Sequence, residues 1–411
     1  MDNYGFVPAD ILLPKCADMT KWSCVACDQY TSEPEYWKTV ESTVNGCPST
    51  LSLMLPEIYL DDSESRTQSI NNCMHEYLQS GVFKLIENSF IYVERTLADG
   101  KVRKGIVGAI DLEVYDYKQG TQALCRPTEA TVVERLPARV EVRKNACIEM
   151  PHIMMLIDDK SKIVVEQFEN KKGTLEKLYD FDLMQNSGHI AGYRVTGDEA
   201  TNVQKAIENL YKADSDNHPM LYAMGDGNHS LAAAKQYYEL VKSELGCEAK
   251  KHPARYALIE LVNLYDESLE FEPIHRVLFD VDVDDFMTEF SKENGLELGK
   301  RDGQVFTVVI GDKKQEYTFT SPDTKLTVGT LQNFIDKYLK NHSGSVDYIH
   351  GDDTVLKLSK PENRIGFIVP GIEKDSFFDV IKKDGVLPRK TFSMGHACDK
   401  RFYLECRKIT K

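Results

Sequence analysis

The residues best suited to do chemistry lie in one short segment, residues 221–238, with the sequence LYAMGDGNHSLAAAKQYY. Asp226 and His229 stand here between an apolar run and an expected helix. The run at 221–224 is too short for a helix and too apolar for a surface loop, which predicts a buried strand. Gly225 and Gly227 adopt positive φ at little cost, so the backbone can turn sharply and approach a ligand closely.

The residues after this turn predict a helix whose N-terminus points at the same place. Asn228 or Ser230 can serve as its N-cap. Its apolar face follows a spacing of threes and fours through Leu231, Ala234, Tyr238, Val241 and Leu245. The first turn of a helix carries unpaired N–H groups and a partial positive charge, so it favours phosphate or carboxylate.

Asp226 would repel a bare anion at that helix end, so beside a nucleotide we expect it to bind a metal or to accept the proton of a hydroxyl group. The alternative is a capped helix after a tight turn, in which Asp226 and His229 only form local hydrogen bonds.

Four blocks of this chain resemble a widespread prokaryotic family known as a domain of unknown function, number ten-fifteen. DGNHSLAAA resembles its Asp-Gly-His-His-Arg segment, and RPTEATVVERLPAR, at 126–139, is similar to its Arg-x-Glu-x-Thr and Asp-Arg-Leu segment. ARYALIELVNLYDESLEFEPIHRVLF, at 254–279, resembles the block with Val-Asn and Pro-x-His-Arg, and GVLPRKTFSMG resembles its Met-Pro-x-Lys-Ser-Thr block. More remotely, the Asp-Gly-His-His-Arg turn is similar to the nucleotide-binding turn of the ParB and sulfiredoxin-like fold, which includes free serine kinases.

That resemblance implies a site in which the turn and helix hold nucleotide phosphates while acidic residues handle the acceptor hydroxyl. This chain departs from the family pattern, because Asn228 replaces the usual first His and Ser230 replaces the usual Arg. Loss of a fixed cation at a phosphate site weakens charge-assisted binding. Arg276, after His275, is a candidate replacement, and a protein that binds its ligand without catalysis is an open alternative.

The resemblance adds further candidates outside the turn. Arg126 and Glu129 are implied to face the site, against the alternative of a solvated face or structural ion pairs. His275 and Arg276 mark the entrance to a strand, where the Arg can equally pair with a structural carboxylate. Lys390 matches the family's Lys and would either close over an anionic ligand or simply be exposed.

The N-terminal region contributes a second acidic candidate. Residues 22–30 are interpreted as a strand that runs into a turn, and the region resembles the family's Pro-Pro-Tyr-Asp turn. Asp28 would then lie at a strand end, where ligand-facing residues are common. Cys24 and Cys27 form a Cys-x-x-Cys pair, but no partner pair completes a zinc site, so a structural role is favoured over redox or metal chemistry.

Composition excludes several function classes. The net charge of −15 over 411 residues argues against nucleic acid as the main partner, although it permits a small nucleotide in a local positive pocket. No apolar run approaches the roughly 18 to 20 residues of a membrane helix. The N-terminus lacks a signal-peptide pattern, so a cytoplasmic protein with reduced thiols is expected.

Helix and strand patterns alternate along the chain without repeats, which predicts an α/β or mixed α+β fold with a mixed sheet. By resemblance, that sheet would carry a ParB/sulfiredoxin-like nucleotide-site turn. We expect a main domain at 1–280 and a smaller C-terminal α+β region at 281–411.

Three functions remain open at this stage. The first is a nucleotide-dependent phosphotransferase that acts on a small hydroxylated metabolite and uses ATP or ADP with magnesium. The second is a non-catalytic nucleotide- or metabolite-binding protein. The third is a metal-dependent hydrolase, suggested by five histidines, although their spacing fits no compact ligand pattern: His189, His218, His229, His252 and His275.

Overall fold

The computed structural model describes residues 4–15, 18–131, 133, 136–214, 216, 218–300 and 302–410. The chain divides into two compact units: unit 1 is Met1–Leu269 with His396–Lys411, and unit 2 is Glu270–Gly395. The expected boundary at 280 falls after β13, Phe271–Phe279, which belongs to unit 2 because it pairs there with β17, Ser345–His350, and β18, Arg364–Ile368. The C-terminal residues from His396 onward belong to unit 1.

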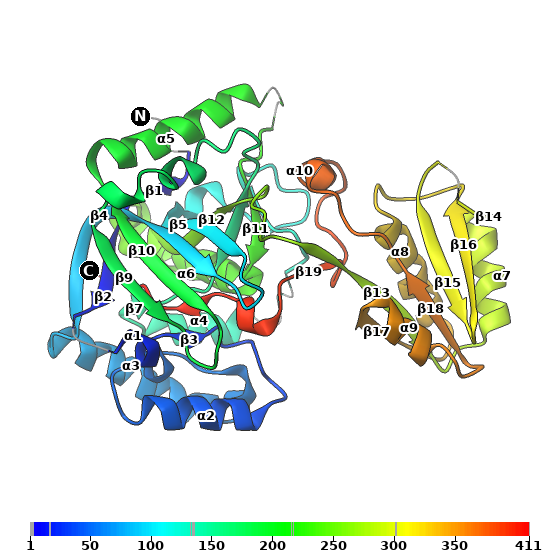
Figure 1. Ribbon diagram of the computed structural model, residues 1–411, viewed down its shortest axis with the longest axis horizontal. Helices are drawn as coiled ribbons and strands as arrows, with labels where there is room; N and C mark the ends of the chain where they lie inside the picture. Colours follow the sequence, from blue (N-terminus) through cyan, green and yellow to red (C-terminus); the bar gives the residue numbers. More distant parts are fainter. Residues whose placement is uncertain are drawn as a thin grey trace. The chain divides into compact units, whose positions relative to one another are not determined.

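Unit 1 is built on a mixed sheet, which confirms the expected mixed α+β class. Among the described residues its strand order is β6-β11-β8-β12-β5-β4-β10-β9, with β1 beside β5 and β2 beside β4 (Figure 1). The strands of this sheet are β1 Phe6–Val7, β2 Ala9–Pro14, β4 Phe83–Thr96, β5 Val102–Asp111, β6 Cys125–Arg126, β8 Met154–Ile157, β9 Lys177–Asp182, β10 His189–Val195, β11 Tyr222–Asp226 and β12 Tyr256–Asn263. Two small pairs join β3 Cys24–Val25 to β20 Phe402–Tyr403 and β7 Ile148–Glu149 to β21 Arg407–Lys408.

Helices cover both faces of this sheet, because its central strands are apolar on both sides. The helices are α1 Met19–Trp22, α2 Pro34–Val44, α3 Ser63–Gln79, α4 Leu136–Lys144, α5 Gly197–Ala213 and α6 Asn228–Leu245. On β4, Ile91 and Val93 pack into the cluster that holds residues of α2, α3 and the C-terminal segment. Phe90 and Tyr92 point the other way, into the cluster that holds residues of α5 and α6. The alternation follows the two-residue period of a strand.

Unit 2 has its own sheet and its own core. Its strand order among the described residues is β14-β16-β15-β18-β13-β17, with β19 paired to β13. The elements not yet given are β14 Leu296–Leu298, β15 Val305–Ile310, β16 Lys313–Phe319, β19 Phe392–Met394, α7 Val283–Asn294, α8 Thr327–Leu339, α9 Asp352–Leu358 and α10 Lys374–Asp384. Leu278 and Val308 face the cluster formed with α7 and α8, whereas Val277 and Val309 face α9.

Most elements expected from the sequence are present. The strand expected at 221–224 is β11. Strand patterns at 90–95 and 105–117 with the turn signal Asp99-Gly100 predict a hairpin, which β4 and β5 form, and patterns at 305–310 and 317–320 predict the hairpin that β15 and β16 form. Helical spacing over 65–88, broken at Gly81, predicts helix on both sides of the break, but α3 ends at Gln79, the chain turns at Gly81, with φ +74, and the residues from Phe83 onward form β4. Among the described helices, none is long and apolar enough to cross a membrane.

Candidate functional site

The turn between β11 and α6 has the geometry that its glycines predict. Asp226 is the last residue of β11, Gly227 has φ +82, and α6 begins at Asn228. A Cβ atom on Gly227 would lie 3.1 Å from the Ile153 Cα atom, so the backbones approach closely at this point. The strand that feeds the turn is buried between β6 and β8, which fixes where the turn begins.

The N-terminus of α6 differs from the expected arrangement. The sequence predicts Asn228 or Ser230 as the N-cap, but Gly227, which has no side chain to cap the helix, takes that position. Asn228, His229 and Ser230 form the half-buried first turn. The expected apolar face is confirmed through Val241, but Leu245 is exposed because the helix ends there at Gly246.

Asp226 forms an ion pair with Lys400, which no sequence motif indicates. Its Oδ2 atom lies 3.2 Å from the Lys400 Nζ atom, and its Oδ1 atom accepts a hydrogen bond of 2.8 Å from the amide of Gly227. Both side chains are mostly buried, at 22% and 17% exposed. Lys400 follows the 3-10 turn Ala397–Asp399 in the C-terminal segment of unit 1. It supplies a cation near the turn where Ser230 replaces the usual arginine.

Asp28 interacts electrostatically with His152 and Lys400. Its Oδ1 atom lies 4.0 Å from the His152 Nε2 atom and accepts a hydrogen bond of 3.1 Å from Gln29. Burial alone would raise the pKa of the Asp28 carboxyl, but His152, the Gln29 bond and the charge of Lys400 together hold that pKa below its ordinary value. Lys400 therefore favours the ionised form of Asp28 and forms an ion pair with Asp226.

A buried hydrogen-bond network orients the His152 side chain that lies next to Asp28. The Tyr403 hydroxyl lies 2.8 Å from the His152 Nδ1 atom and donates a hydrogen bond to the Cys27 Sγ atom at 3.1 Å. Because that hydroxyl has a single proton, its oxygen accepts from His152, which orients the Nε2 atom toward Asp28. His152 and Tyr403 were not predicted, since neither lies in a motif with recognisable spacing.

Cys24 and Cys27 have a structural role here. Burial raises the pKa of both thiols, that of Cys27 to about 12 with a further contribution from the charge of Asp28. None of the cysteines that the structure describes forms a disulfide. A thiol that stays protonated is a poor nucleophile and a poor metal ligand, so this pair is not suited to redox or zinc chemistry.

Arg126 lies on β6, the strand paired with β11, opposite Ala223. Its guanidinium donates to the backbone oxygens of Ala123, at 2.8 Å, and His218, at 3.0 Å. Desolvation by burial lowers the pKa of this guanidinium. These bonds connect the loop that precedes β6 to the loop that precedes β11, so Arg126 positions these two loops. Glu129 follows β6 and is half-buried.

The remaining candidates belong to unit 2. The Arg276 guanidinium is fully buried, and its donors contact Gln332 at 3.0 Å, the Arg389 oxygen at 3.2 Å and the Ile274 oxygen. These contacts use donors of the guanidinium inside unit 2, and Lys400 is a cation that unit 1 itself places at the turn. His275 is also buried there, 3.0 Å from Asp352, and Lys390 is exposed with φ +57.

The comparisons with known proteins identify the family. The model of the family described as "Protein of unknown function (DUF1015)" matches residues 11–338, so the chain belongs to that family. No curated protein matches the chain.

Several solved structures are distantly similar to the chain. Free serine kinase in complex with AMP has 14% identity and a TM-score of 0.39, with 75% of this chain and 92% of that chain covered. A variant of free serine kinase in complex with ADP has 13% identity and a TM-score of 0.39, with coverage of 75% and 93%. A C-terminally truncated SbnI from Staphylococcus aureus has 10% identity and a TM-score of 0.37, with coverage of 70% and 82%.

Proposed function

We propose that the protein is a nucleotide-dependent phosphotransferase that acts on a small hydroxylated metabolite, with its site at the turn between β11 and α6. The observation that carries the proposal is the ion pair of Asp226 and Lys400 next to the first turn of α6, with Asp28 near enough for the charge of Lys400 to lower its pKa. Phosphoryl transfer needs a phosphate cradle, a cation for the transferred group and carboxylates for a metal ion and for the acceptor. This part of unit 1 offers each of these.

Each group has a task that fits its surroundings. The N-terminus of α6 binds a phosphate through its backbone amides. Lys400 stabilises the negative charge on the transferred phosphoryl group, as fixed cations do at such sites. Asp226, next to the helix end, would hold a magnesium ion, which would supply positive charge to the phosphate groups. Asp28 is the candidate acceptor of the hydroxyl proton, since its charged form is held by His152 and Lys400.

A non-catalytic nucleotide- or metabolite-binding protein is the second candidate function. It is favoured by Asn228 and Ser230, which stand where the family resemblance predicts His and Arg. It shares the phosphate cradle with the first candidate but requires no turnover. The metal-hydrolase hypothesis gains no support, since none of its five histidines joins a cluster with metal-ligand geometry among the described residues.

The first experiment is a thermal-shift screen of the purified protein against ATP, ADP and other nucleotides, each with and without magnesium. A ligand at 100 times its dissociation constant adds roughly 2.7 kcal/mol, which moves the melting midpoint by several degrees. We expect a magnesium-dependent shift for one nucleotide. The absence of any shift would reject the phosphotransferase and leave, of the second candidate function, only the binding of another metabolite.

The second experiment measures transfer of phosphate to a panel of amino acids and sugars. We expect Asp28→Asn to lower kcat by about 10²–10⁴-fold while nucleotide binding is kept, as for loss of a general base. Asp226→Asn is expected to remove the magnesium dependence of binding. Binding without turnover in the unmodified protein would favour the second candidate function.

A further inference from the structure

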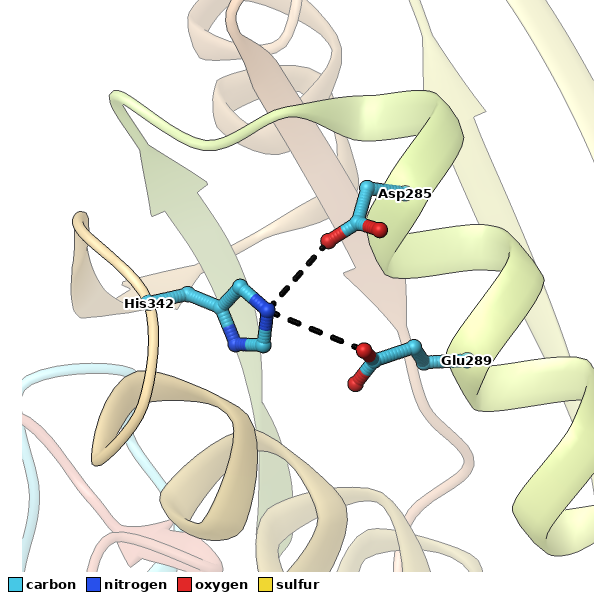
Figure 2. A group of neighbouring side chains, drawn as sticks. All are labelled: Asp285, Glu289 and His342. Carbon is cyan, nitrogen blue, oxygen red and sulfur yellow. Dashed lines mark ion pairs between the residues drawn. The ribbon is translucent and has the colours of Figure 1, made fainter.

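A second group of side chains with metal-ligand character lies in unit 2, apart from the residues of the proposed phosphotransfer site. Asp285 and Glu289 are one turn apart on α7, and His342 follows the end of α8. Phe286 and Phe290, the next positions along α7, are fully buried in the unit 2 core. Burial of that stripe turns Asp285 and Glu289 together toward the solvent-facing side, where both point at His342 (Figure 2).

The imidazole of His342 is fixed by contacts with Tyr338. The His342 Nδ1 atom lies 3.1 Å from the backbone oxygen of Tyr338, and the two rings stack with centroids 4.0 Å apart at 5°. A carbonyl oxygen can only accept, so Nδ1 carries a proton and donates it. Neutral His342 therefore presents the lone pair of Nε2, and the same orientation by a backbone carbonyl is typical of histidines that bind metals.

The Nε2 atom of His342 faces two carboxylates at distances that suit ligands of one ion. It lies 3.5 Å from the Asp285 Oδ2 atom and 3.7 Å from the Glu289 Oε1 atom. These distances are long for hydrogen bonds. Ligands bound at about 2.0–2.1 Å around a tetrahedral zinc ion lie roughly 3.3–3.5 Å from each other. The three candidate ligand atoms lie within 4.8 Å of one another, close enough for one ion to contact all of them.

His189 in unit 1 shows the contrasting arrangement. Its Nδ1 atom lies 2.7 Å from Asp182, and its Nε2 atom lies 2.7 Å from Asp180, so each nitrogen has its own carboxylate at hydrogen-bond distance. The two carboxylates lie on opposite sides of the ring and cannot share an ion with it. Two neighbouring carboxylates are thus not sufficient to suggest a metal site. His342 differs from His189 because both of its carboxylates face the same nitrogen, Nε2.

We propose that Asp285, Glu289 and His342 form a binding site for one divalent transition-metal cation of the zinc class. The imidazole nitrogen favours such a cation over magnesium or calcium, which prefer all-oxygen ligand sets. Three protein ligands leave a fourth position for water or another ligand. The Tyr338 hydroxyl, which donates to Asp285 at 2.9 Å, holds that carboxylate in place. The bound ion joins α7 to the segment after α8 and stabilises unit 2.

The test is a calorimetric titration of chelator-treated full-length protein with Zn²⁺. We expect the unmodified protein to bind one more zinc ion than His342→Gln, and Glu289→Gln to bind that ion at least tenfold more weakly. His189→Gln is the matched control, because it removes a histidine between two carboxylates and is expected to titrate like the unmodified protein. All four proteins keep the same cysteines, so zinc bound to thiols cancels in the comparison.

A second readout separates the site from a folding defect. Saturating Zn²⁺ is expected to raise the melting temperature of the unmodified protein and of His189→Gln, but not that of His342→Gln, while circular dichroism shows that the variants are folded. Identical zinc titrations of the unmodified protein and His342→Gln would overturn the proposal. So would loss of the zinc ion in His189→Gln. Neither result depends on phosphotransfer activity.

Discussion

Among individual side chains, Lys400 is the one whose role follows most directly from its contacts. Its ammonium is the cation that lies within 3.2 Å of Asp226 and acts on the charge of Asp28. We expect Lys400→Met to lower turnover by about 10²–10³-fold, as for the loss of one donor that stabilises charge in a transition state. The control is Lys172→Met, which removes a lysine 2.7 Å from Glu94 elsewhere in unit 1. Equal effects of the two substitutions on kcat would contradict the assignment.

His275 makes the stability of unit 2 depend on pH. Its Nδ1 atom accepts a hydrogen bond from the amide of Val369, so its Nε2–H donates to Asp352 and the buried ring is neutral. Burial lowers the pKa of His275 below 6.5. Below about pH 6.5 the unfolded chain therefore takes up this proton first, and the free energy of unfolding falls as the pH falls further.

Urea unfolding followed by circular dichroism at about pH 7.5 and about pH 5.5 measures this effect. At the higher pH we expect His275→Gln to have a lower free energy of unfolding than the unmodified protein. Between the two pH values, however, the free energy of unfolding of His275→Gln should fall less than that of the unmodified protein. His189→Gln is the control, because desolvation of His189 is outweighed by its hydrogen bonds to Asp182 and Asp180, which raise its pKa. Removing a group shifted in that direction cannot reduce the loss at acid pH, so an equal reduction in both variants would refute the role of His275.

For single elements, the turn before α6 tests how much the fold depends on one glycine. A side chain at Gly227 meets both a φ of +82 and Ile153 at 3.1 Å, whereas Gly81, just after the end of α3, has φ +74 and open space around it. We expect Gly227→Ala to cost about 1–2 kcal/mol for the left-handed backbone, plus the cost of displacing Ile153. Gly81→Ala should cost only the backbone part. The difference between the two, measured by urea unfolding, isolates the close approach.

The same elements show what local sequence can and cannot predict. The strand, the turn at Asp226 and the helix after it follow from a short apolar run, two glycines and a spacing of threes and fours, which are local signals. Lys400 gives no such signal, because it is brought to Asp226 by the fold of a segment far along the chain. Arg276 shows the converse, since the motif beside a proline left a ligand contact and a structural pairing equally open, and the side chain donates to Gln332 and to the Arg389 oxygen within unit 2.

For the chain as a whole, the C-terminal segment is what completes unit 1. Arg401 bridges Glu260, at 2.8 Å, and Glu405, at 2.7 Å, and all three side chains are buried. The indole of Trp22 donates to the Leu404 oxygen at 2.9 Å, and β20 pairs with β3. Buried polar contacts therefore hold the segment that contains Lys400 in place.

Arg401→Met should therefore destabilise unit 1 by about 3–5 kcal/mol, because it leaves two buried carboxylates without their partner. The two tryptophans of the chain, Trp22 and Trp37, are both buried in unit 1, so intrinsic fluorescence reports the unfolding of that unit. We expect the fluorescence midpoint in urea to fall sharply for Arg401→Met. Arg364→Met is the control, because it removes an arginine 4.7 Å from the Phe279 ring in unit 2, where no described residue is a tryptophan. An unchanged fluorescence midpoint in Arg401→Met would show that the C-terminal segment does not stabilise unit 1. The contacts of Arg401 would then not explain how Lys400 is held beside Asp226.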